Sequence, residues 1–266
     1  MIMNTVSSAS ITGMVVSLIL SVGLPIVLCV LLKIKTKAKW SDMLLGAVVF
    51  LVFALFLEQT LHMLMSALFG VALTGNIWLY ALYGGAAAAL FEEGGRLVAM
   101  KFFLEGHLEK DNALMYGVGH GGAEAILVGG LSCFSNLTTV ELINGGMLES
   151  ALSGLDEAAL ESTMANISQL WTMPSYMFYM AGIERVSALF LQICLSYFVY
   201  RAVRYHNRNF LIAAVGIHFA VDAVSALLSN VLPIPALEAI LLVTVAVLIF
   251  ITVKLYRGEK EAKAEG

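Results

Sequence analysis

The chain has 266 residues, of which 60% are hydrophobic and 13% are charged, and its mean hydropathy is +0.88. This composition excludes an ordinary soluble domain and is typical of a protein that crosses a membrane several times. The formal net charge of -4 decides little by itself, and the sequence carries no nucleic-acid-binding signature. We therefore expect an all-α polytopic membrane bundle, a single transmembrane domain over residues 1–266, in the plasma membrane of a bacterium.

Seven apolar runs are long enough to cross a bilayer, which takes about 20 residues. The runs cover approximately Ile11–Leu32, Met43–Phe69, Ile77–Leu104, Ala113–Phe134, Tyr176–Val203, Phe210–Ser229 and Leu237–Tyr256. The first run lacks a basic start and a clear small-residue cleavage site, so we expect it to be retained as a span. The spans within residues 77–229 should form the core of the bundle.

The basic residues predict the orientation of these spans. Of the 15 lysines and arginines, all except Arg96 and Arg185 lie beside the links after spans one, three and five, or after span seven. The positive-inside rule then predicts an outside N-terminus and a cytoplasmic C-terminus with a short tail at 257–266. The longest link, about 135–175, would lie outside, and we expect a short helix in it from Asp156 to Leu170.

Polar pairs one helical turn apart interrupt three of the apolar runs. They are Glu92 with Arg96, His120 with Glu124, and His218 with Asp222, and Glu93 stands beside Glu92. Residues four apart share one face of a helix. Because a charge at membrane depth is unfavourable by about 3 kcal/mol or more, such a face turns to the protein interior or to a wet cavity. The pairs lie at similar depth, so we expect them to meet.

Such a cluster suits hydrolysis inside a membrane. Hydrolysis needs a water, a base that activates it and a group that polarises the scissile carbonyl. Carboxylates can act as the base, and histidine can donate to an oxyanion or, together with carboxylates, bind a metal ion. Packing alone explains a lone histidine in a span, but not two histidines, three glutamates, an aspartate and an arginine at one depth.

Small side chains indicate where helices pack closely. Several glycines surround His120 and should let span four approach its neighbours. They are Gly117, Gly119, Gly121 and Gly122. The cysteines Cys29, Cys133 and Cys194 have no metal-ligand spacing, and we expect them to pack as small apolar residues.

The motif order Glu92-Glu93-x-x-Arg96, His120-x-x-x-Glu124, an arginine-containing span and His218-x-x-x-Asp222 resembles the YhfC-type intramembrane proteases. Those proteins are relatives of the PrsW proteases and of the CAAX prenyl protease/bacteriocin-processing (CPBP) group. The resemblance covers spans three to six. It implies an endopeptidase that uses glutamate-activated water to hydrolyse a peptide bond of a membrane-anchored protein or peptide.

The resemblance also implies roles for individual residues. Glu92 and Glu93 would be the base and its partner, Arg96 their counter-ion, and His218 the group that polarises the carbonyl, with its ring oriented by Asp222. Either a divalent metal such as zinc or no metal would be bound. The candidate ligands are Glu93, His120, Glu124 and His218.

Two further parts of the family pattern match this sequence only in part. Glu124 stands where the prenyl proteases carry histidine, as in the PrsW pattern, and His120 is an additional candidate. Glu184-Arg185 in span five matches the arginine motif, but Gln192 replaces the histidine expected about seven residues later.

Other interpretations remain open at this point. Buried acids and histidines also line the paths of proton or metal-ion transporters and channels, although no inverted repeat is present. A non-catalytic membrane scaffold or immunity protein is a third class, for which Gln192 is the one hint. Glu58 and His62, one turn apart in span two, either line the same cavity or pair with Arg185.

Overall fold

The computed structural model describes residues 5–264, and this part of the chain contains helices and no β-strand. Six helices in it are long and apolar enough to cross a membrane. They are α1 (Ser8–Lys35), Trp40–Phe69, Lys110–Asn144, α10 (Tyr176–Arg204), α11 (Arg208–Leu228) and Ile234–Glu259. The all-α polytopic membrane fold is therefore confirmed, and six of the seven expected spans are helices of the required kind.

The remaining expected span, 77–104, is helical but more polar than the other six. It consists of α5 (Ile77–Val98) and a short π-helical segment, η2 (Ala99–Phe103). The charges of Glu92, Glu93 and Arg96 lie in α5, which explains why it falls outside the set of strongly apolar helices. The number of crossing helices and the orientation of the termini stay predictions.

The link between spans four and five is mostly helical, which corrects the expectation of a loop from residue 135. The third long helix comprises α6 (Lys110–Glu124), η4 (Ala125–Gly130) and α7 (Leu131–Asn144). Its hydroxyl side chains donate back to the preceding turn, as Thr139 Oγ1 does to Ser135 O at 2.9 Å, so these polar residues remain helical.

Two short helices, α8 (Leu148–Leu152) and α9 (Glu157–Thr172), complete that link. Asp156 caps α9 by accepting a hydrogen bond from the Ala159 amide at 2.8 Å. The helix expected from Asp156 to Leu170 is therefore confirmed.

The chain forms two compact units. One comprises the described residues up to Leu24 together with Ala125–Val186, and the other comprises Pro25–Glu124 with Ser187 onward. The first unit packs around a cluster of apolar residues: Val6, Met14, Val140, Ile143, Leu148, Leu170 and Phe178. The second unit has a larger apolar core and holds most of the predicted site residues. The single domain expected over 1–266 stays a prediction.

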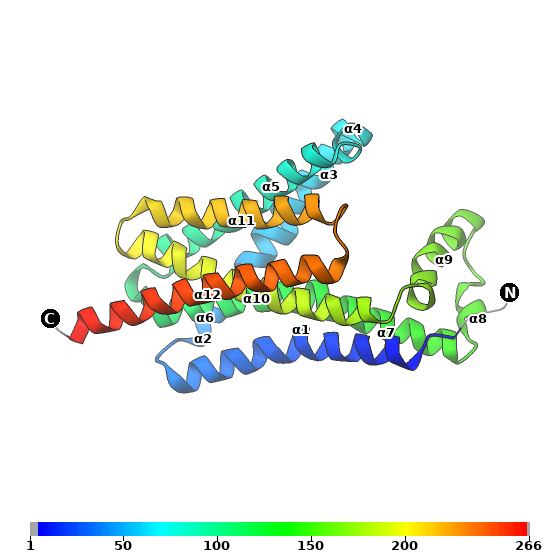
Figure 1. Ribbon diagram of the computed structural model, residues 1–266, viewed down its shortest axis with the longest axis horizontal. Helices are drawn as coiled ribbons and strands as arrows, with labels where there is room; N and C mark the ends of the chain where they lie inside the picture. Colours follow the sequence, from blue (N-terminus) through cyan, green and yellow to red (C-terminus); the bar gives the residue numbers. More distant parts are fainter. Residues whose placement is uncertain (1–4, 265–266) are drawn as a thin grey trace. The chain divides into compact units, whose positions relative to one another are not determined.

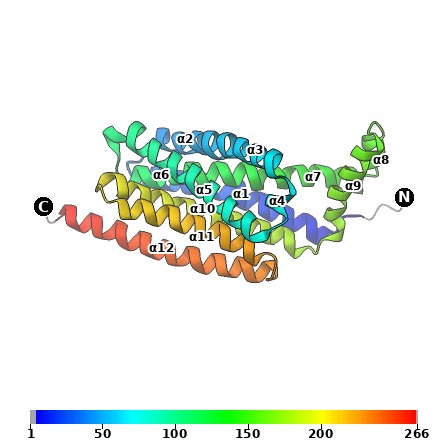
Figure 2. The same cartoon turned by 90° about the horizontal axis from the view of Figure 1, so that it is seen from above.

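Helix pairs organise the second unit. In it α2 (Trp40–Val49) packs on α6, and α5 packs on α11 (Figures 1 and 2). The π-helical segment η1 (Phe50–Glu58) and α3 (Gln59–Phe69) continue α2, and η1 also contacts α5. The short elements α4 (Val71–Thr74) and η3 (Glu105–His107) lie in the links on either side of α5 and η2.

The distribution of polarity is the reverse of that in a soluble protein. Phe56 and Met63 are 66% and 68% exposed, whereas Glu93, Arg96 and His120 are 0% exposed. Apolar side chains that face outward suit lipid, and charges that face inward avoid it. The chain is accordingly a multi-pass membrane protein.

The last helix, α12 (Ile234–Ala264), continues through the predicted tail as far as residue 264. Buried Glu259 accepts hydrogen bonds from Tyr197 Oη at 2.9 Å and Tyr200 Oη at 2.6 Å, which fasten this end of α12 to α10. The side chains of Lys260 and Lys263, and residues 265–266 of the expected tail, lie outside the described part.

Glycines bring the backbones of α2 and α6 together. A Cβ on Gly119 would lie 2.0 Å from Met43 O, and a Cβ on Gly46 would lie 2.2 Å from Tyr116 O. No side chain fits between backbones at such distances. The predicted role of Gly119 in close helix packing is therefore confirmed.

Glycines also allow close contacts between α6 and α10 and between α5 and α11. A Cβ on Gly117 would lie 2.8 Å from Ile193 Cα, and one on Gly121 would lie 2.8 Å from Gln192 Cβ. On α5, a Cβ on Gly85 would lie 2.9 Å from Phe219 O. The three contacts set the spacing of the helices that carry the polar pairs.

The cysteines behave as packing residues, as predicted. All three are buried and free of disulfides. Cys29 lies with its sulfur 3.0 Å from Met43 Sδ and 3.5 Å from Met115 Sδ, in a small apolar cluster.

The close contact at Gly119 predicts a stability effect. Gly119→Ala should lower the free energy of unfolding by about 1–3 kcal/mol, because its methyl group overlaps Met43 O and forces α2 and α6 apart. The measurement is thermal or denaturant unfolding in detergent. Gly84→Ala is the matched control: no atom lies within 4 Å of its Cβ, and its stability should be unchanged or higher. Equal destabilisation of both variants would contradict the role of this contact.

Candidate active site

Arg96 lies at the centre of a buried polar cluster in the second unit. Its Nη1 donates to Glu93 Oε1, and its Nη2 donates to Gln192 Oε1. The same Nη2 lies 3.8 Å from Glu92 Oε2. Because Arg96 is 0% exposed, its charge is balanced entirely by groups of the protein.

Glu92 turns toward α6 and α10. Its Oε2 lies 2.9 Å from His120 Nε2 and accepts a hydrogen bond from Gln192 Nε2, also at 2.9 Å. Successive helical residues diverge by about 100°, so the neighbouring Glu93 faces other partners. Glu92 retains 9% exposure of its side chain, whereas the side chain of Glu93 has none.

Glu93 turns toward α11. Its Oε1 lies 2.8 Å from His218 Nδ1 and also accepts from Arg96. The other ring nitrogen of His218, Nε2, lies 3.5 Å from Asp222 Oδ2, and the Asp222 side chain is 37% exposed. His218 thus stands between a fully buried and a partly exposed carboxylate.

Gln192 of α10 is the site residue that the sequence did not predict as a participant. Its Nε2 donates to Glu92 Oε2 and to Glu124 Oε2, each at 2.9 Å, and its Oε1 accepts from Arg96. One amide therefore joins carboxylates from α5 and α6 to the buried arginine. The available signal was an amide in an apolar span at the position of an expected histidine.

His120 is held by aromatic rings as well as by Glu92. The Phe50 ring meets it edge-on with centroids 5.4 Å apart, and the Tyr116 ring stacks at 6.2 Å. Three buried polar atoms of the cluster, His120 Nδ1, Glu93 Oε2 and Arg96 Nε, have no hydrogen-bond partner among the described residues. These atoms keep the capacity to bind a substrate group or a water.

A second line of polar side chains starts at Glu58. Glu58 Oε1 lies 3.1 Å from His62 Nε2, and His62 Nδ1 lies 2.8 Å from Tyr83 Oη. Glu58 is 7% exposed and lies within electrostatic range of the cluster. The charges that act on it are those of Glu92, Glu124, His218 and Asp222. Of the two alternatives for Glu58, the structure favours proximity to the predicted site.

Glu184 and Arg185 belong to the first unit. Arg185 donates to the carboxylate of Glu184 through Nε and Nη2. The predicted arginine motif is thus an ion pair between sequence neighbours, and its part in the site stays a prediction.

The described side chains are not arranged as a preformed metal site, and the predicted metal ligands stay a prediction. Among the residues whose side chains are described, no three His, Cys, Asp or Glu side chains are placed to hold one ion. The imidazole nitrogens that face the glutamates are engaged in hydrogen bonds of 2.8–2.9 Å. The expected ligands Glu93, His120, Glu124 and His218 therefore form a hydrogen-bonded cluster with Arg96 and Gln192.

Comparison with known proteins places the chain in a family. Residues 20–247 match the YhfC intramembrane metalloprotease family. The uncharacterized membrane protein YhfC of Bacillus subtilis (strain 168) is 37% identical over 206 residues, which cover 76% of this chain and 79% of that protein. No solved structure matches the chain. With most of its length matched and a relative of this similarity, the chain belongs to the YhfC intramembrane metalloprotease family.

Proposed function

We propose that the protein is an intramembrane endopeptidase that hydrolyses a peptide bond of a membrane-associated substrate with water activated by a glutamate. The observation that carries the proposal is the meeting of Glu92, Glu93, Arg96, His120 and His218 in one buried cluster. These side chains come from α5, α6 and α11. A set of this kind is energetically unfavourable in a membrane, so its presence points to a function. The name of the family supports the same reaction class.

Glu92 is the proposed base. A base must touch the water that it activates, and Glu92 is the member of the glutamate pair with an accessible side chain. Its Oε2 is fixed by His120 and Gln192, so the carboxylate is oriented before substrate binds. Glu93, fully buried and paired with Arg96, is a positioning residue that holds His218.

The reaction then proceeds by proton transfer within the cluster. Glu92 takes a proton from water, and the resulting hydroxide adds to the carbonyl carbon of the scissile bond. His218, whose Nδ1 is committed to Glu93, offers its Nε2 face to the oxyanion, donating when that nitrogen is protonated. The C–N bond breaks, and the proton held by Glu92 passes to the departing amine.

Partial exposure indicates which side chains meet the substrate first. Asp222 and Glu124 are less buried than Glu93, Arg96 and His120. They therefore lie at the accessible edge of the cluster. An extended segment of a membrane-anchored chain that reaches Glu92 would pass these two carboxylates.

Replacement of the base predicts a loss of activity with the fold retained. Glu92→Gln should lower cleavage by about 10²–10⁴-fold, because the amide keeps the shape of the side chain but cannot take a proton. The measurement is a comparison of newly formed peptide N-termini in membranes from cells that carry the wild type or the variant.

Glu141→Gln serves as the control, because it removes an exposed carboxylate of α7 outside the cluster. It should cleave like the wild type. Unchanged cleavage by Glu92→Gln would remove the proposed mechanism.

The roles of the two glutamates also predict different stabilities. Glu93→Gln should lower the free energy of unfolding by about 3–5 kcal/mol, because it leaves the buried charge of Arg96 without its closest partner. Glu92→Gln should lower the free energy of unfolding by less, since Arg96 Nη2 lies 3.8 Å from the Glu92 carboxylate and Arg96 lies closer to other partners. Unfolding in detergent measures both.

The double variant Glu93→Gln/Arg96→Met removes the buried pair together. It should recover much of the lost stability but no activity. If the double variant is no more stable than Glu93→Gln, the ion pair is not the reason for the loss.

The position of Glu58 close to the cluster predicts an effect on the pH dependence of cleavage. Glu58→Gln removes a titratable carboxylate on which the charges of Glu92 and His218 act, so the pH profile should shift while folding is kept. Glu58→Asp, which restores the charge, should return the profile toward that of the wild type. If Glu58→Gln lowers the cleavage rate but leaves the pH profile unshifted, Glu58 acts only as a packing residue.

A further inference from the structure

A hollow with a volume of about 730 Å³ lies at one end of the second unit, where η2, the end of α10 and the start of α11 meet. Positively charged or titratable side chains from these elements line it. They are Lys101, Arg204, His206 and Arg208. Among the residues with described side chains, none that lines it is acidic. The positive-inside rule predicts that this end of the unit is cytoplasmic.

The short link between α10 and α11 brings two of these charges together. Residues 205–207 reverse the chain, and the Asn207 side chain caps α11 by accepting from the Asn209 amide at 3.1 Å. Arg204 ends one helix and Arg208 begins the next. Two like charges held at one turn repel each other and favour a bound anion.

The described carboxylates do not neutralise these charges. Among the residues that the structure describes, Lys101, Arg204 and Arg208 form no ion pair, and Lys101 instead lies 5.4 Å from the centroid of the Phe102 ring. Arg96, by contrast, is paired with Glu93 inside the cluster. The hollow therefore offers positive charge to a molecule from outside.

The remaining wall of the hollow is apolar. It is formed by Leu97, Met100, Leu108, Ala202, Val203, Leu211 and Ile212. Ile212 is 67% exposed, so this wall continues onto the outward, lipid-facing surface of α11. A ligand that fits both parts has an anionic head and a hydrocarbon tail.

We propose that this hollow binds an anionic phospholipid of the predicted cytoplasmic leaflet. The phosphate lies among Lys101, Arg204 and Arg208, and an acyl chain lies along Leu211 and Ile212. Clusters of basic residues at the cytoplasmic ends of membrane helices attract anionic lipid by about 1 kcal/mol per charge. The apolar wall favours a lipid over a free phosphate ion, which shares the same headgroup chemistry.

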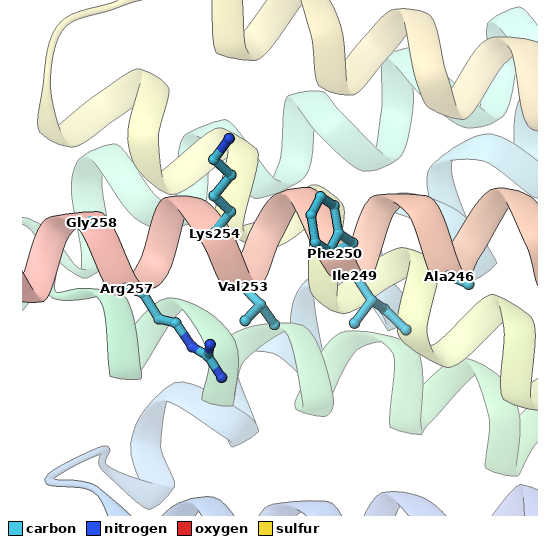
Figure 3. A pocket seen from close by; sticks show the side chains of 7 residues that line it. All are labelled: Ala246, Ile249, Phe250, Val253, Lys254, Arg257 and Gly258. Carbon is cyan, nitrogen blue, oxygen red and sulfur yellow. The ribbon is translucent and has the colours of Figure 1, made fainter.

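A second hollow, along α12, provides a comparison. Its lining residues all come from α12 and include Lys254, Arg257 and Phe250. In the view of Figure 3 the side chain of Lys254 points upward and that of Arg257 points downward, so their charged ends diverge. These two charges do not converge, so they serve as the control for a general loss of positive charge.

The test measures lipid binding by native mass spectrometry of the purified full chain in mild detergent. The protein is titrated with phosphatidylglycerol and, separately, with phosphatidylcholine that carries the same acyl chains. The wild type should bind phosphatidylglycerol about tenfold more tightly or better, because only that lipid has a net negative head. Equal binding of the two lipids overturns the proposal.

Charge variants locate the site. Arg204→Gln/Arg208→Gln should lose about tenfold or more of the phosphatidylglycerol affinity, and Lys254→Gln/Arg257→Gln should lose less than about twofold. Equal losses in the two double variants overturn the proposal. Arg204→Lys/Arg208→Lys, which keeps both charges, should bind nearly as the wild type does, and it keeps the test decisive if the glutamine variant does not fold.

Two further measurements distinguish a bound lipid from a bound soluble anion. Ile212→Trp keeps every charge but fills the apolar wall, and it should weaken phosphatidylglycerol binding severalfold. Inorganic phosphate in excess should not displace the lipid. If phosphate displaces the lipid, or if Ile212→Trp binds as the wild type does, the hollow is a site for a soluble anion and the lipid assignment is wrong.

Discussion

The buried guanidinium of Arg96 is the constraint on which the second unit depends. A hydrocarbon environment offers no solvation to this charge, and the side chain is 0% exposed, so its partners must come from the protein. Glu93 supplies a carboxylate from the same helix, and Gln192 supplies an acceptor from α10. Pairing Arg96 therefore ties α5 to α10, and the glutamates that balance its charge carry the ties onward to α6 and α11.

The short polar side chains can reach each other only because the helices lie close together. Gly119 allows contact between the backbones of α6 and α2, and Gly121 allows contact between α6 and the Cβ of Gln192. Gly85 does the same for α5 and α11. The small residues therefore set the distance between the helices, and the polar residues form hydrogen bonds across that distance. A span rich in glycine is weak as an isolated helix, and its packing compensates for that weakness.

The sequence predicted those parts of the site that follow from one helix at a time. The spacing of Glu92 with Arg96 and of His218 with Asp222 fixes which residues share a face, and membrane depth restricts where that face can turn. Gln192 stood out only as the replacement of an expected histidine, because a neutral amide in an apolar span does not by itself indicate a role in a site. Its importance arises when α10 meets α5 and α6. The continuation of α7 through residues 135–144 escaped prediction for a related reason: serine, threonine and asparagine suggest a loop unless their side chains bond back to the helix.

Adjacency in sequence separates the two glutamates rather than pairing them. Their side chains leave α5 about 100° apart, so Glu92 engages His120 and Gln192 while Glu93 engages Arg96 and His218. A dyad that shares one proton would need the two carboxylates to face each other, which this divergence prevents. The helix geometry instead gives the pair unequal surroundings, one carboxylate sealed beside a permanent positive charge and the other partly accessible. Unequal surroundings are what allow two identical side chains to take the separate tasks of base and structural anchor.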